Sequence, residues 1–421
     1  MFKIFSNAWK VGEIRKKILY TLMILVIVRI GAQIALPGIN VAYVQLMSGS
    51  QGIGTLYNVI AGGANSAWSI FALGIGPYIT SSIIMQLLTV AIPKLEQLNK
   101  EGEEGRKKIQ SYTRYLTVVL ALLQATGYTL NYRSLFLSNS AFVYAIAVLS
   151  MVAGTIFIMW LAEQITAKGI TNGSSMIIFV NIISSLPMAV ASLYNNIVAR
   201  GVIGVVSVVA VIVVLLLVIF YITIINEGER RIPVQYSSKM VGRRAMGGQS
   251  TTLPIRVNTA GVISIIFAIS ILQFPAQIAS FMGGATGAFA SIIAAIDITA
   301  PIGTILYVVL IILFSFFYTS ITVNPNEIAE NMKKNGGFIP GIRPGAPTSN
   351  YIAGVVKNVT AVGAILFAIV ALVPVLLQWV LGVNVGFGGT TLIIVVGVCL
   401  DIVKSLESQL LQRHYKGFLN E

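Results

Sequence analysis

The stretch that decides the fold is residues 201–225, which read GVIGVVSVVAVIVVLLLVIFYITII. These 25 residues contain no charged side chain, and most of them are Val, Ile or Leu. A helix needs about 20 apolar residues to cross the roughly 30 Å hydrocarbon core of a bilayer. Because no water is available there to satisfy a broken backbone, the stretch predicts a transmembrane helix that can face lipid all round.

Nine further apolar stretches of roughly spanning length flank this one. Together they predict ten transmembrane helices, at residues 19–36, 69–91, 112–130, 141–161, 174–193, 201–225, 258–281, 303–323, 358–380 and 387–403. Charged residues make up 10% of the 421-residue chain and hydrophobic residues 56%, whereas an average soluble domain is about 25% charged. This composition excludes soluble globular and disordered proteins and indicates an all-α polytopic membrane protein. Alternating segments typical of a β-barrel do not occur.

Lysine and arginine set the predicted orientation. Of the 28 such residues, 25 lie before the first stretch, in alternate connections or in the C-terminal tail. The positive-inside rule makes that side cytoplasmic and places both termini there. The opposite connections hold only Arg133 and Arg200, and Arg29 lies within the first stretch. No small-residue cleavage site follows the basic start, so we expect a retained first helix and not a cleaved signal peptide.

The sequence offers no constellation for catalysis or metal binding. One cysteine (Cys399) and one histidine (His414) exclude a disulfide framework and Cys- or His-based metal sites. No nucleotide loop of the GxxxxGK[ST] type occurs. We therefore expect neither a cofactor nor an enzyme activity.

Small and polar residues concentrate in the second, fifth, seventh and tenth stretches. The second contains Gly74, Gly76 and Pro77, and the fifth contains Asn181 and Pro187. Such residues serve either close helix packing or the lining of a wet interior pathway, and composition leaves both interpretations open.

Charges that would couple transport to ions are nearly absent. Glu163 and Asp401 stand at cytoplasmic ends of stretches, and Arg29 is the only clear mid-span charge. Arg29 can simply snorkel or cap a carbonyl. A proton- or sodium-coupled carrier is therefore disfavoured, and a passive conduit driven from outside is favoured. The alternative is a secondary transporter of a small solute, with its site where glycine and proline break the second helix.

Three connections are unusual. The external segment 37–68 is uncharged and rich in glycine, which fits either a floppy loop or a re-entrant helix buried in protein. The cytoplasmic loops 226–257 and 324–350 are long and basic. In the first loop, residues 232–236 and 251–256 predict a hairpin around a turn at 240–248. Its basic tip either sets topology near lipid headgroups or docks on RNA or an acidic protein face.

Several motifs carry a resemblance to a known family. Residues 69–88, SIFALGIGPYITSSIIMQLL, resemble the second helix of the SecY/Sec61-alpha family, the channel subunits of protein translocases. The resemblance covers the whole chain and is closest to bacterial, Gram-positive members. Further matches are EGEEGRKK at 101–108, QSTTLPIRVN at 249–258, GIRPG at 341–345, FGGTTLII at 387–394 and RHYKG at 413–417.

This resemblance implies an hourglass channel of two pseudo-symmetric halves, residues 1–200 and 201–421, hinged outside between the fifth and sixth helices. The channel opens across the membrane for secreted chains and sideways for hydrophobic helices. Its constriction is implied to be an aliphatic ring, which dewets or seals around a moving chain without binding particular side chains. Carried over by motif, the ring residues are Ile79, Ile83, Ile178, Ile182, Ile266 and Ile394.

The resemblance also assigns a plug, a sideways gate, docking residues and partners. The gate lies between spans two and three and spans seven and eight, with Gln86 and Asn258 as polar contacts. Arg243, Arg244 and Arg343 are the implied docking residues. The re-entrant plug helix comprises Leu56, Tyr57, Asn58, Val59, Ile60, Ala61, Gly62, Gly63, Ala64, Asn65 and Ser66.

The implied partners are SecE-like and SecG-like subunits, the SecA motor ATPase, the ribosome, signal peptides, nascent chains and membrane lipids. The implied location is the bacterial plasma membrane. One position departs from the family pattern, because Ser264 stands in the seventh span where the family often has a proline. We expect this change to remove a kink from the gate helix.

Overall fold

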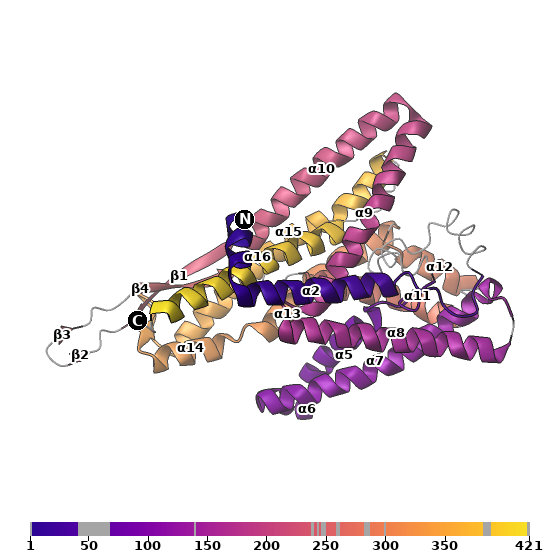
Figure 1. Cartoon of the computed structure of the whole chain (residues 1–421). Coiled ribbons are helices and arrows are strands. Elements are labelled where there is room, and N and C mark those ends of the chain that lie inside the picture. Colours follow the sequence, from indigo (N-terminus) through magenta and orange to yellow (C-terminus); the bar gives the residue numbers. More distant parts are fainter. Residues whose placement is uncertain are drawn as a thin grey trace.

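The computed structural model describes residues 2–40, 68–138, 140–236, 240–241, 244–245, 250–257, 262–281, 287–298, 300–381 and 389–418. Long helices dominate it, and a small sheet lies at one end (Figure 1). The helices are α1 (Phe2–Lys10), α2 (Gly12–Gly31), α5 (Gly76–Ala91), α6 (Pro93–Lys100), α7 (Glu103–Asn131), the 3-10 helix η1 (Arg133–Leu135), α8 (Ala141–Lys168), α9 (Gly173–Arg200), α10 (Val202–Glu227), α11 (Ile263–Phe281), α12 (Gly287–Ile296), α13 (Pro301–Thr322), α14 (Pro325–Lys334), α15 (Ala346–Leu381) and α16 (Gly389–Phe418). The strands are β1 (Glu229–Tyr236), β2 (Met240–Val241), β3 (Arg244–Ala245), β4 (Ser250–Arg256) and β5 (Gly337–Phe338).

Each of the ten predicted stretches overlaps one helix, namely α2, α5, α7, α8, α9, α10, α11, α13, α15 or α16. Within the described residues, four segments are long and apolar enough to cross a membrane by themselves: Ala141–Lys168, Gly204–Glu227, Pro301–Lys334 and Ala346–Leu377. A fifth results if α5 and α6, which meet at an angle of 100°, count as one bent span. The chain is therefore a helical protein with several membrane-spanning segments.

Several helices continue beyond their apolar stretches. α7 begins at residue 103 and not 112, α15 begins at 346 and not 358, and α8 continues to 168. Hydropathy marks only the part of a helix that lies in lipid. Backbone hydrogen bonding continues into water wherever the next residues tolerate helix, so the predicted bounds were too short at these ends.

The predicted second span was wrong at its start, because residues 69–75 form turns and not helix. The backbone N–H of Ile70 donates to the carbonyl of Ile34 at 3.0 Å, which ties this segment to the end of α2. Gly74 has a φ of +56°, a left-handed conformation that glycine adopts without strain. Pro77 occupies the first turn of α5, where its missing N–H costs nothing.

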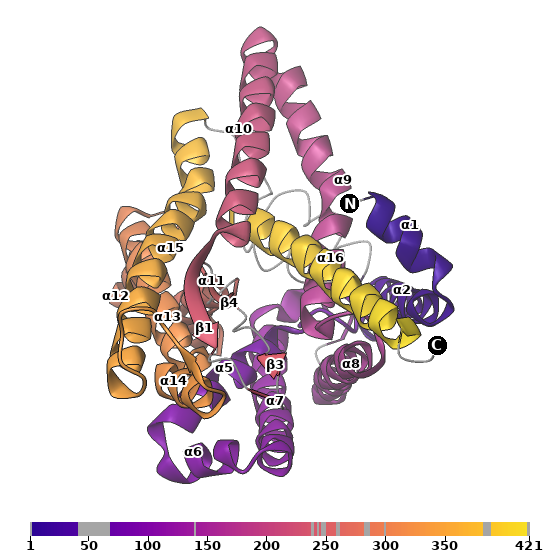
Figure 2. The ribbon, with the colours of Figure 1, turned by 90° about the vertical axis from the view of Figure 1, so that its left-hand side faces the viewer.

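Two clusters of buried side chains form most of the core. The first joins α2, residues 71–75, α8 and α9, whereas the second joins α10, α11, α13 and α15. α16 contributes to both clusters, through Ile394 and Val398 to the first and Ile393 and Val396 to the second. In Figure 2, α16 runs diagonally from the α10 side of the molecule toward α1 and α2. It therefore connects the two halves of the chain.

Replacing Gly154 with alanine is expected to destabilise the fold by about 1–3 kcal/mol. A Cβ atom on Gly154 of α8 would lie 2.3 Å from the carbonyl oxygen of Ile70, which is backbone and cannot rotate away. The matched control is Gly354→Ala in α15, where nothing lies within 4 Å of the added carbon. That variant should be neutral or more stable by up to about 1 kcal/mol. Thermal unfolding of the purified protein in detergent distinguishes the two, and equal shifts would contradict the close packing of α8.

The hairpin predicted from residues 232–236 and 251–256 is confirmed. β1 and β4 pair antiparallel, with Ile232 opposite Leu253, and β2 and β3 form a short ladder near the turn. The sequence pattern did not indicate β5, which pairs with the other edge of β1. Ile232, Val234 and Ile255 pack against residues of α14 and α15 in a separate cluster. The two long basic loops therefore form one structured unit.

The C-terminal part of α16 forms hydrogen bonds and apolar contacts with residues of the first half of the chain. Ser405 Oγ donates to the carbonyl of Ile170 at 2.6 Å, and Gln409 Nε2 donates to the same carbonyl at 3.4 Å. Lys17 Nζ donates to Gln409 Oε1 at 3.3 Å. Leu406 is fully buried against Ala8 and Ile14. α16 thus spans from the second cluster to the N-terminal helices.

Candidate functional site

Six isoleucines from four helices come together where the two core clusters meet. Ile178, Ile182 and Ile394 belong to the first cluster, and Ile83 belongs to the second. Ile79 and Ile266 are packed against both clusters. The helices concerned are α5, α9, α11 and α16, so both halves of the chain contribute. We call these six residues the isoleucine ring.

The isoleucine ring faces the interior of the protein and not its outer surface. The exposed fractions of Ile83, Ile178, Ile182 and Ile394 are 4%, 4%, 1% and 3%, and Ile79 and Ile266 are half-buried. Their neighbours on the same helices differ, because Ile183 and Ile271 are 41% and 40% exposed. The rotation of α9 and α11 therefore turns their ring residues inward.

Local sequence explains this arrangement. Ile79 and Ile83 on α5 are four residues apart, as are Ile178 and Ile182 on α9, so each pair occupies one helix face. Two of the hydroxyls between Ile79 and Ile83 bond within their own helix. Thr80 Oγ1 and Ser81 Oγ donate to the carbonyls of Gly76 and Pro77, at 3.1 and 2.8 Å. These two donors are therefore used within α5.

A cavity of about 270 Å³ opens on one side of the isoleucine ring. Ile178, Ile266 and Ile394 form its apolar part. Its polar lining comes from both halves of the chain and carries charges of both signs: Asn172, Ser175, Asn226, Arg256, Tyr318, Asp401 and Lys404. The polar cavity therefore adjoins apolar side chains, and apolar surfaces of this kind oppose the passage of water and ions.

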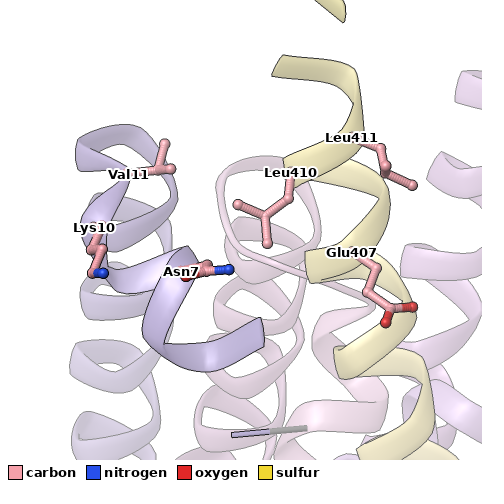
Figure 3. A pocket seen from close by; sticks show the side chains of 6 residues that line it. All are labelled: Asn7, Lys10, Val11, Glu407, Leu410 and Leu411. Atoms are coloured by element: carbon pink, nitrogen blue, oxygen red, sulfur yellow. The ribbon is translucent and has the colours of Figure 1, made fainter. Parts of the chain in front are cut away.

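A second, more open hollow of about 520 Å³ lies between α1 and α16 (Figure 3). It is lined by Asn7, Lys10 and Val11 from α1 and by Glu407, Leu410 and Leu411 from α16. None of these residues belongs to the ring or to its cavity. This hollow therefore lies apart from the isoleucine ring.

The helices assigned to the sideways gate lie next to each other. α11 contacts both α7 and α5, and α13 packs against α11. Gln86 is exposed on α5, whereas Asn258 lies outside the described residues. Ser264 is buried in the first turn of α11, where a proline is also tolerated. The expected loss of a kink at this position was therefore wrong, because a proline there would not bend the helix.

The assigned docking residues and the plug are only partly described. Arg343 is exposed in the segment between β5 and α15. Its carbonyl accepts a hydrogen bond from Thr348 Oγ1 at 2.8 Å. Arg244 lies in β3, while Arg243 and the plug, residues 56–66, lie outside the described residues.

One polar contact between α7 and α8 was not indicated by the sequence pattern. Arg114 binds Glu163 in a bidentate manner, with Nε–Oε1 and Nη2–Oε2 distances of 2.8 Å. Gln110 Nε2 donates to the same carboxylate at 3.2 Å. In the sequence, the only indication of this contact was that Arg114 and Glu163 both lie at ends of predicted spans. In the described part of the chain, no three His, Cys, Asp or Glu side chains gather as metal ligands would.

A SecY family model matches residues 69–403 of the chain. The chain belongs to the SecY family. The Streptomyces scabiei protein translocase subunit SecY is 45% identical over 438 residues, and the Halalkalibacterium halodurans subunit of the same name is 43% identical over 430 residues. In both comparisons the match covers 100% of each chain. The resemblance to SecY in the sequence motifs is thereby confirmed.

Solved structures of SecY and Sec61 channels have the same fold. "The structure of a protein conducting channel" superimposes with a TM-score of 0.69, covering 93% of this chain and 91% of the other at 18% identity. A structure on the plug domain of SecY, which "maintains a membrane seal", and Sec61 in the canine ribosome–channel complex each give a TM-score of 0.66 over the same shares, at 19% and 18% identity. At these identities the likeness shows the fold alone.

Proposed function

We propose that this chain is the protein-conducting channel of a bacterial Sec translocase. It passes unfolded secretory polypeptides across the plasma membrane and releases transmembrane segments sideways into lipid. The observation that carries this proposal is that six isoleucines from both halves of the chain lie in or against the two core clusters, and that three of them line a polar cavity. The relatives are translocase subunits and not carriers or enzymes by name, so the small-solute transporter is no longer an alternative.

The chemistry of the ring suits a substrate of any sequence. Aliphatic side chains form no directional bonds, so the ring adapts to each residue of a passing polypeptide without binding it. When no polypeptide is present, the same surfaces expel water and oppose ion flow. A binding site for one solute would instead need convergent polar groups, and the hydroxyls of Thr80 and Ser81 on α5 are hydrogen-bonded to their own helix.

Ten transmembrane helices with both termini in the cytoplasm agree best with the charge pattern. A helix occurs in each predicted stretch, and 25 of the 28 basic residues fall on one side. In this topology the halves are residues 1–200 and 201–421, and the turn at Gly201 between α9 and α10 is the external hinge. We assign the role of the plug to residues 56–66, which lie outside the described residues.

Energy for transport comes from a partner, since the sequence holds no nucleotide loop of its own. We infer that the SecA motor or a ribosome docks on the cytoplasmic unit of β1, β4, β5 and α14, through Arg243, Arg244 and Arg343. A Sec61 relative of the fold occurs in a ribosome–channel complex. SecE-like and SecG-like subunits complete the assembly.

A stalled secretory chain should cross-link to cysteines placed at Ile83 and Ile266. The native Cys399 is exposed and is first replaced with serine, so that every cross-link reports the ring. Ile271→Cys serves as the control, because Ile271 is on the same helix as Ile266 but is 40% exposed on another face. Cross-links at residues 83 and 266 that exceed those at 271 about tenfold support the channel. Equal labelling at all three positions would refute it.

A further inference from the structure

Arg29 is the one clear charge in the middle of a predicted span, and the structure gives it a partner. It lies half-buried in the last turn of α2. Its Nη1 donates a hydrogen bond to Oδ1 of Asn181 on α9, at 3.4 Å. A charge inside a membrane is costly and usually marks a function when it faces the protein interior.

Asn181 stands beside the isoleucine ring. Its exposed fraction is 3%, it precedes Ile182 directly, and it lies three residues after Ile178. A contact that holds Asn181 in place therefore also holds the single turn of α9 that carries Ile178 and Ile182. The same turn faces α2, since Val28 and Ile182 belong to one buried cluster.

α9 is weakened next to this turn. Pro187 lies inside the helix and cannot donate to the carbonyl of Ile183. Ser184 Oγ and Ser185 Oγ donate to the carbonyls of Asn181 and Ile182, at 2.8 and 2.7 Å. Proline and back-bonding hydroxyls both favour bending of a helix. The ring-bearing turn thus adjoins a site where α9 bends easily.

Beyond Pro187, one face of α9 is exposed. It carries Val190, Tyr194 and Val198, and the helix ends at Arg200, followed by Gly201 with a φ of +54°. In Figure 1, α9 and α10 form a hairpin that projects from the other helices. Movement of this hairpin would shift Ile178 and Ile182 unless the ring-bearing turn is held independently.

We propose that Arg29 is a positioning residue for the isoleucine ring. Its hydrogen bond to Asn181 holds the ring-bearing turn of α9 on α2, so the outer part of α9 moves at Pro187 while the ring stays closed. This inference rests on the proposed function. α2 contributes no residue to the ring, but in this inference it helps to keep the ring closed.

The test is a double-mutant cycle on the full chain, reconstituted with its partner subunits in planar bilayers. Asn181→Leu and Arg29→Met each remove the hydrogen bond and should raise the resting ion leak about tenfold. The double variant should leak no more than either single variant, because the same contact is lost. Asn181→Asp retains an acceptor and should leak like the unmodified chain.

Two controls separate this inference from the proposed function. Val26→Ala changes an exposed residue of α2 and should leave the leak unchanged. The second control, Ile83→Asn, tests whether the ring itself forms the seal. If Ile83→Asn leaks and Asn181→Leu does not, the positioning role is refuted and the channel stands. Additive effects of the two single variants would also refute it, and a silent Ile83→Asn would refute the channel.

Discussion

Replacing Ile79, Ile83 and Ile266 together with asparagine is expected to raise the resting ion conductance about a hundredfold. These residues come from both halves of the chain and meet where the two core clusters join. Each amide side chain hydrates and lowers the free-energy barrier to a water-filled pore by about 1 kcal/mol. Three such changes together give about two orders of magnitude in rate. Single-channel recording of the reconstituted translocase measures the effect.

The matched control replaces the same three isoleucines with leucine. Leucine keeps the apolar character and nearly the volume of the side chain, so the seal should persist. A second control, Ile271→Asn, adds an amide on an exposed face of α11. If the triple asparagine variant conducts no more than these controls, the six isoleucines do not form the seal.

Reversing the charge of Arg343 should reduce SecA-driven export at least about tenfold and leave the protein folded. The loop around Arg343 is conformationally restricted. Prolines at 340 and 344 fix φ at two positions of the loop, and Gly341 and Gly345 adopt the φ values of +82° and +106° that its turns require. Thr348 is buried, and its Oγ1 donates a hydrogen bond to the carbonyl of Arg343. The loop therefore presents an exposed guanidinium on a rigid support, which suits a docking contact.

The assay for this prediction is translocation of a precursor into vesicles that contain Arg343→Glu. Lys357→Glu is the matched control, because Lys357 is an exposed cation on the neighbouring helix α15. That variant should export normally. Normal export by Arg343→Glu, with the same amount of protein in the membrane, would exclude Arg343 from docking.

The helices were predictable from sequence because hydropathy is a local property. The stretch 201–225 corresponds closely to α10, and the alternation in 232–236 indicated β1 and its partner. The turn structure of 69–75 was not predictable in this way. It depends on a backbone hydrogen bond to Ile34, far back in the chain, and on the left-handed conformation of Gly74.

The residues of the functional site could not be predicted by physical reasoning from the sequence alone. Nothing in the spacing of residues brings Ile79 next to Ile394, more than 300 positions later. Only the likeness of the motifs to SecY placed both in a ring. The partner of Arg29 had no sequence signal at all, because Asn181 was one of several polar residues in its stretch.

The position of α16 in the chain also matters for biosynthesis. The ribosome makes α5, α9 and α11 well before it reaches Ile394, so a ring built as we propose is incomplete until translation passes that residue. A product truncated before Ile394 would lack the contribution of α16 to the ring. We expect such a product to leak ions, so premature termination should depolarise the membrane as well as stop secretion.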